Sequence, residues 1–278
     1  CPGTRYSLEI SKSAIKACLN KDVDEFYFTM WGDHGGECSP FSALPALVAG
    51  AEFAKGNFDM PSIKEIFKQK IGMDFDLFSS LENPDLVYAK ENEPADVVSP
   101  TRAMLYSDTL CGVFDANVQE GVAPNYYKNL SVLLKDGETN EEWGYLFKNL
   151  RALCDVLEIK FDLGVKTRKA YKSNDEQTLT QIVEKEYPAL LDRLEAFYNA
   201  FESAWMTDRK PFGFEVQDIR IGGVIQRVKH CKKTLEKYLN GELARVEELE
   251  QEILVPFGST HGKVNGIRYA TLPTTGVI

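Results

Sequence analysis

Apolar side chains recur at spacings of three and four along the second half of the chain, which predicts long helices that each bury one face. Such stripes run from Trp143 to Phe161, from Leu190 to Trp205 and from Val224 to Leu239, and a shorter one runs from Leu243 to Ile253. Long, aromatic-rich stripes of this kind form protein cores. Three long stripes and a short one predict an antiparallel helical bundle over about residues 125–256.

The first sixty residues show a different pattern. A short amphipathic helix is expected over Ile10–Leu19, and the apolar, aromatic run Phe26–Trp31 is typical of a buried β-strand. A glycine-rich polar loop follows, and a helix is expected from about Pro40 to Lys55, with Ser39 as its cap. A strand, a polar loop and a helix in this order form the corner where α/β barrels place their chemistry.

The next segment is expected to be less regular. A helix opens at Pro61 and stops at Gly72, and the stretch from Asp74 to Asn117 is interrupted by Pro84, Pro94 and Pro100. We therefore expect irregular chain between the N-terminal elements and the bundle.

The loop after the expected strand carries the candidate chemistry. Trp31 offers a flat apolar face, and Asp33 and Glu37 offer four acceptor oxygens among three glycines. A tryptophan at a strand end is often only core, and a single loop carboxylate is usually just solvated. An indole beside two carboxylates also suits a sugar ring, whose C–H face stacks and whose hydroxyls donate. The combination favours a sugar-binding site.

At this loop the chain resembles a known family. The segment M-W-G-D-H-G-G-E-C-S-P-F-S-A-L-P (residues 30–45) resembles the last barrel strand and loop of family 20 glycoside hydrolases, the β-N-acetylhexosaminidases. The closer likeness is to the exo-β-N-acetylglucosaminidases that carry a helical domain after the barrel. It continues in Pro100–Asp115 and Arg209–Gly223 and so covers nearly the whole chain. The resemblance implies a mainly α chain: residues 1–60 as the C-terminal fragment of a (β/α)₈ (TIM) barrel catalytic domain, and residues 61–278 as an α-helical domain.

The family's catalytic pair, an adjacent Asp-Glu at the end of an earlier barrel strand, has no counterpart here. Asp24-Glu25 begins the expected strand and Asp175-Glu176 lies in a helical region, so neither fits. We therefore expect no catalytic residue in this chain and no hydrolysis by the chain alone.

The resemblance implies a substrate-assisted, retaining mechanism. An upstream acid protonates the leaving oxygen, an upstream Asp orients the acetamido group, and the acetamido oxygen attacks the anomeric carbon. In this chain Trp31 would wall the sugar subsite, while Asp33 and Glu37 would accept hydrogen bonds from the O4 and O6 hydroxyls of a terminal N-acetylglucosamine. Acceptors on these hydroxyls would reject a chain-extended sugar, which makes the enzyme exo-acting.

The composition limits the classes of partner that the chain is expected to bind. The formal net charge of −10 and the pI of about 5.0 argue against nucleic acid and anionic membranes, and no run of about twenty apolar residues would span a bilayer. Six widely spaced cysteines without a C-x-x-C, and three distant histidines, argue against a metal site and suit reduced thiols in the cytoplasm. Cys154 and Cys231 are expected in the core. No motif predicts a cofactor.

Other readings stay open. The chain could be a non-catalytic helical interaction or dimerisation module, or a free-standing carbohydrate-binding domain, and the helical domain could form a homodimer. The segment Arg209–Glu215 could reach back to the barrel mouth or across to a second subunit, but an interhelical loop with an ion pair is favoured. Asp218 and Arg220 are expected near a helix start. The sequence does not decide the roles of Arg209, Asp218 and Arg220.

Overall fold

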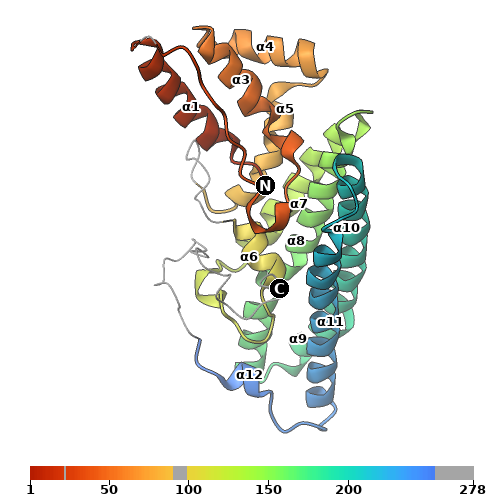
Figure 1. The fold of residues 1–278 in the computed structure, drawn as a ribbon. Helices are drawn as coiled ribbons and strands as arrows, with labels where there is room; N and C mark the ends of the chain where they lie inside the picture. Colours follow the sequence, from red (N-terminus) through yellow and green to blue (C-terminus); the bar gives the residue numbers. More distant parts are fainter. Residues whose placement is uncertain (22, 90–98, 254–278) are drawn as a thin grey trace.

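The computed structural model describes residues 1–21, 23–89 and 99–253, and within these ranges it contains helices and no β-strand (Figure 1). The α-helices are α1 (Thr4–Leu19), α2 (Asp33–Gly36), α3 (Leu44–Ala54), α4 (Met60–Ile71), α5 (Phe75–Ser79), α6 (Pro100–Tyr106), α7 (Val122–Lys135), α8 (Gly144–Lys172), α9 (Glu176–Gln181), α10 (Tyr187–Asp208), α11 (Phe214–Leu239) and α12 (Glu247–Glu250). Short 3₁₀ turns, η1 to η4, cover Pro40–Ala43, Ser80–Leu86, Asp115–Asn117 and Asp136–Thr139, and a π turn, η5, covers Ile182–Glu186.

Four helices, α7, α8, α10 and α11, pack side by side as a bundle in which successive members run in opposite directions (Figure 1). The contacts between α8 and α10 show this order. Tyr145 near the start of α8 donates to Asp208 at the end of α10, and Lys166 further along α8 pairs with Glu186 just before α10. The antiparallel helical bundle expected from the stripes is therefore confirmed, within the residues that the structure describes.

The apolar stripes form the main core. Phe147 and Leu157 on α8, Leu194 on α10 and Leu235 on α11 are fully buried. The two thiols of Cys154 and Cys231 are equally buried, as expected, and burial raises the pKa of Cys231 to about 11. All six cysteines are free thiols.

The stretch between residues 74 and 117 is more helical than expected. It contains α5, η2, α6 and η3. The prolines open or join helical turns here: Pro100 occupies the first turn of α6, where its missing N–H needs no partner, and Pro84 lies inside a 3₁₀ turn. Pro94 lies outside the described residues. At the other end, the stripe from Leu243 to Ile253 yields only the four-residue α12, although Val246 and Leu249 are buried.

The N-terminal helices build a second, smaller core. Ile15 of α1, Ala49 and Phe53 of α3 and Ile63 of α4 form it. Helix α4 also sends Phe67 into the main core, so the two cores meet within one helix. The domain boundary expected at residue 60 stays a prediction.

The segment Phe26–Trp31 is not a strand, which corrects the expectation for it. No regular secondary structure is assigned to it, and no residue in the described ranges belongs to a β-strand. A strand is stabilised by hydrogen bonds to a neighbouring strand, so an isolated one does not form. The terminal βα element of a barrel is therefore not seen in this structure. The helix start expected after the loop is confirmed: the Ser39 side chain accepts from the N–H of Phe41, and Pro40 opens the helical turn that leads into α3.

Candidate functional site

The residues that sequence patterns single out lie in one segment, residues 31–42, which we call the site loop. Two of its glycines are required by the conformation of the backbone or by a close contact. Gly35 and Gly36 have φ of +86° and +67°, the left-handed region that other residues avoid. A Cβ on Gly35 would also lie 2.8 Å from Nη1 of Arg220. The loop can therefore turn tightly against α11 only because glycine stands there.

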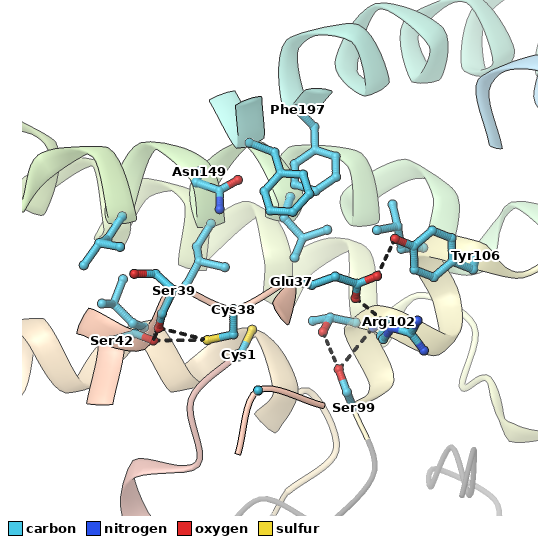
Figure 2. Close-up of a pocket in the computed structure, with 18 of the residues that line it drawn as sticks. Cys1, Glu37, Cys38, Ser39, Ser42, Ser99, Arg102, Tyr106, Asn149 and Phe197 are labelled. Atoms are coloured by element: carbon cyan, nitrogen blue, oxygen red, sulfur yellow. Dashed lines mark hydrogen bonds and ion pairs between the residues drawn. The ribbon is translucent and has the colours of Figure 1, made fainter. Parts of the chain in front are cut away.

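Glu37 sits at the centre of the site, and its carboxylate receives three hydrogen bonds from helices far along the chain. Arg102 donates from Nε to Oε2 at 2.7 Å, and Tyr106 donates its hydroxyl to Oε1 at 2.8 Å (Figure 2). Arg220 donates from Nη1 to Oε1 at 3.1 Å. Two guanidinium groups and a phenol fix the carboxylate in one orientation and use three of its roughly four lone-pair positions. The remaining position, on Oε2, can accept a further donor.

The buried helix α6 carries two of these donors. Arg102 and Tyr106 are four residues apart, so they share one face of α6, and the guanidinium lies 5.2 Å from the centre of the phenol ring. Burial and the negative charge of Glu37 raise the pKa of Tyr106 well above its ordinary value. The phenol therefore remains a hydrogen-bond donor at physiological pH.

Both ends of α6 are anchored. At its start, Asp85 accepts from the hydroxyls of Ser99 and Thr101, and Ser99 caps the N–H of Arg102. At its end, the buried ammonium group of Lys160 donates to the carbonyls of Met104 and Ser107 at 2.8 and 2.6 Å. Burial lowers the pKa of Lys160 to about 8. These contacts hold the helix, and with it the donors that face Glu37.

The α10–α11 connection also reaches the site loop. Arg209 donates to the carbonyl of Cys38 at 2.7 Å while its guanidinium lies 4.5 Å from the ring centre of Trp205. Gln217 donates to the carbonyl of Gly35 at 3.2 Å. Arg209 thus connects two helices and also reaches back to the loop. Asp218, near the start of α11 as expected, accepts from Tyr198 away from the site.

A cavity of about 340 Å³, the site cavity, lies where the site loop, α6, α8 and α10 meet (Figure 2). Its polar lining includes Glu37, Ser39, Ser42, Arg102, Tyr106 and Asn149. Its apolar lining includes Leu81, Leu105, Leu146, Leu153, Phe197 and Phe201. An apolar chamber with a few convergent polar groups is the usual form of a small-molecule site.

The three predicted binding residues are placed differently. Glu37 lines the site cavity. Trp31 also borders it, but its side chain is 81% exposed and its indole N–H donates to the hydroxyl of Thr29. Asp33 begins α2, and its side chain lies outside what the structure describes. The sequence did not identify Arg102 and Tyr106 as partners of Glu37. Their four-residue spacing within Pro100–Asp115 is a signal that could have placed both on one helix face.

Neither of the Asp-Glu steps in the chain lies at this site. Asp175 caps α9 by accepting from the N–H and hydroxyl of Thr178, and Glu25 accepts from the hydroxyl of Tyr27. Within the described part of the chain, no cluster of three or more histidine, cysteine or carboxylate groups could hold a metal ion. None of the described helices is both long enough and apolar enough to cross a membrane.

Comparison with models of protein families matches residues 76–267 to the domain described as Glycoside Hydrolase 20C C-terminal domain. The match covers more than half of the chain, and it includes Arg102, Tyr106 and Arg220. Glu37 and the rest of the site loop lie before it. No curated protein matches the chain.

Proposed function

The chain belongs to glycoside hydrolase family 20 through its 20C C-terminal domain, and we propose that it is the C-terminal part of an exo-β-N-acetylglucosaminidase. Its substrates would be glycans that end in N-acetylglucosamine. The resemblance of the site loop to the last barrel strand and loop of these enzymes supports this proposal. The catalytic acid and the acetamido-orienting Asp would come from residues outside this chain.

The fixed carboxylate of Glu37 is the observation that carries the proposal. A carboxylate held by Arg102, Arg220 and Tyr106 cannot turn away, yet it keeps an acceptor position beside the site cavity. A sugar hydroxyl that donates to it forms a charge-assisted hydrogen bond in a partly apolar chamber. In this proposal Glu37 and Asp33 accept from the O4 and O6 hydroxyls of the terminal sugar.

Trp31 would supply the apolar wall. Its exposed indole can present a flat face to the C–H side of a sugar ring, and its N–H is already occupied by Thr29. The site cavity is small for a ligand site, whose volumes run from about 300 to 1,000 Å³. A chamber of about 340 Å³ suits a single sugar ring, as an exo-acting enzyme requires.

The test is steady-state hydrolysis of an aryl β-N-acetylglucosaminide by the full-length protein that contains this chain. Glu37→Gln should lower kcat/KM by about 1.5–3 kcal/mol, the value of one charge-assisted hydrogen bond. Discrimination between the gluco and galacto epimers should also weaken, since these substrates differ at O4. Glu184→Gln, an exposed carboxylate away from the site cavity, is the matched control.

Three results would count against this function. Equal kinetics of Glu37→Gln and the wild type would remove Glu37 from the sugar site. Loss of folding together with activity would make it a structural clamp. Hydrolysis by the 278-residue chain alone, above a denatured control, would contradict the assignment of the catalytic pair to residues outside it. If the full-length protein were inactive, a saccharide titration would separate a carbohydrate-binding domain from an interaction module.

A further inference from the structure

One wall of the site cavity comes from the bundle helices α8 and α10, and this wall is almost wholly apolar. It consists of Leu146, Leu150, Leu153, Phe197 and Phe201, and the exception is Asn149. Figure 2 shows Asn149 projecting from α8 toward the site loop, beside the ring of Phe197 on α10. A single amide therefore faces the same cavity as Glu37.

The carbonyl oxygen of the Asn149 amide is not satisfied within the part of the chain that the structure describes. This atom, Oδ1, is buried and has no hydrogen-bond partner among the described residues. A buried amide oxygen without a partner lowers the stability of the folded state, and asparagine is also a poorer helix former than leucine. Packing would therefore be served better by another leucine at this position. Something other than the stability of the bundle accounts for an amide here.

The cavity indicates what could satisfy the amide. An apolar ligand would leave it unpaired. A hydroxyl both donates and accepts, and a primary amide offers both functions because its two ends exchange by a half-turn. The volume of about 340 Å³ and the carboxylate of Glu37 also suit a small polyhydroxylated ring.

We propose that Asn149 hydrogen-bonds a ring hydroxyl of the terminal N-acetylhexosamine, so that the helical domain forms one wall of the sugar site. This inference rests on the proposed function and adds to it a substrate contact from the bundle. The helical domain then contributes directly to substrate recognition, and its apolar side chains close the chamber against a longer glycan.

The experiment compares Asn149→Leu with the wild type in the full-length protein. With an aryl β-N-acetylglucosaminide, kcat/KM should fall about five- to tenfold, the effect of losing one neutral hydrogen bond. The thermal midpoint should stay equal or rise, because a buried amide oxygen without a partner is replaced by an apolar group. Asn199→Leu on α10, an exposed asparagine outside the cavity, is the matched control and should leave both values unchanged.

Deoxy substrates identify the contact. The 3-, 4- and 6-deoxy analogues each remove one ring hydroxyl. For the hydroxyl that Asn149 binds, the effects of the deoxy substrate and of Asn149→Leu should not add, because both remove the same hydrogen bond. Additive effects for all three analogues, or a kcat/KM within twofold of the wild type, would overturn the inference.

Direct binding separates this inference from the proposed function. N-acetylglucosamine is titrated into the wild type and into Asn149→Leu, and the heat of binding is measured. Weaker binding by the variant, with no hydrolysis by the wild type, would leave the contact standing while the enzymatic proposal fails. Normal hydrolysis with equal binding by both proteins would overturn the contact alone. Absence of binding by the wild type would overturn it as well.

Discussion

Two apolar segments of this chain differ in how far their side chains are buried. The stripe from Leu190 to Trp205 lies on α10 and is buried in the bundle, whereas Tyr27 and Trp31, in a run of similar aromatic character, are 84% and 81% exposed. Both segments are rich in aromatic side chains, so aromatic content alone does not explain the difference.

The difference lies in what each backbone needs. An α-helix satisfies its own N–H and C=O groups, and α10 then finds apolar faces on α8 and α11 within the same chain. A strand depends on a neighbouring strand for those bonds, and the described residues contain none. An apolar run therefore indicates that a segment tends to be buried. A helix can be buried by other helices of the same chain, whereas a strand also needs a neighbouring strand.

The largest expected effect tests the buried side of this comparison. Trp205 is 6% exposed, packs against Phe201 and Phe214, and donates to the carbonyl of Lys210. Trp205→Ala should lower the free energy of unfolding of the chain by about 3–5 kcal/mol, through the lost contacts and the cavity left behind. Urea unfolding provides the measurement. Met206→Ala, the exposed neighbour, is the control, and a similar small change in both would place Trp205 at the surface.

The next effect concerns the contact between the bundle and the site. Lys160→Met should lower the free energy of unfolding by about 1–3 kcal/mol, because the carbonyls of Met104 and Ser107 lose their buried donor. Lys148→Met, exposed on the same helix, should have almost no effect.

The same residue predicts a pH dependence. The pKa of Lys160 is about 8 in the folded chain, below its ordinary value of 10.5. Between these values the unfolded chain holds more protons at Lys160, so its contribution to stability rises with pH. The advantage of the wild type over Lys160→Met should grow from about pH 8 to about pH 9.5, below the ordinary ionisation of tyrosine near 10. A difference that shrinks over this range would mean that Lys160 is not desolvated.

A smaller effect is expected in the site loop. Gly35→Ala should lower the free energy of unfolding by about 1–2 kcal/mol because φ is positive there, and should also displace Arg220 from Glu37. Gly56→Ala is the control: φ is +83°, but no atom lies within 4 Å of the added Cβ. Gly56→Ala should show the backbone effect alone. Equal stability losses and equal kcat/KM in the full-length protein would show that the loop does not need to approach α11 closely.

The smallest effect is expected for the exposed indole of Trp31. Trp31→Ala should change the free energy of unfolding of the chain by less than about 0.5 kcal/mol, since the indole is mostly in solvent. Paired with Trp205→Ala, it compares two tryptophans in one unfolding experiment. A loss above 2 kcal/mol for Trp31→Ala would mean that the indole is packed in solution.

The bundle could be predicted from the sequence because a helix period records which face is buried. The end of α4 at Gly72 and the cap Ser39 at the start of η1 could also be predicted, because both depend on local conformation. Local pattern was less informative where partners are distant. It did not predict α6, whose anchors, Asp85 and Lys160, are set by tertiary packing. It selected Glu37 from its loop, but the guanidinium of Arg102 that faces it is 65 positions away, a distance over which no periodicity carries information.

The contact between Glu37 and Arg220 spans 183 positions of the chain. On a ribosome that adds about 5–20 residues per second, roughly 10–40 seconds separate the synthesis of these two residues. During that interval the carboxylate lacks the donor from α11, and the loop lacks the helix against which Gly35 turns. The site therefore assembles only after α11 has been synthesised, and a product truncated before α11 would carry the loop without its binding geometry.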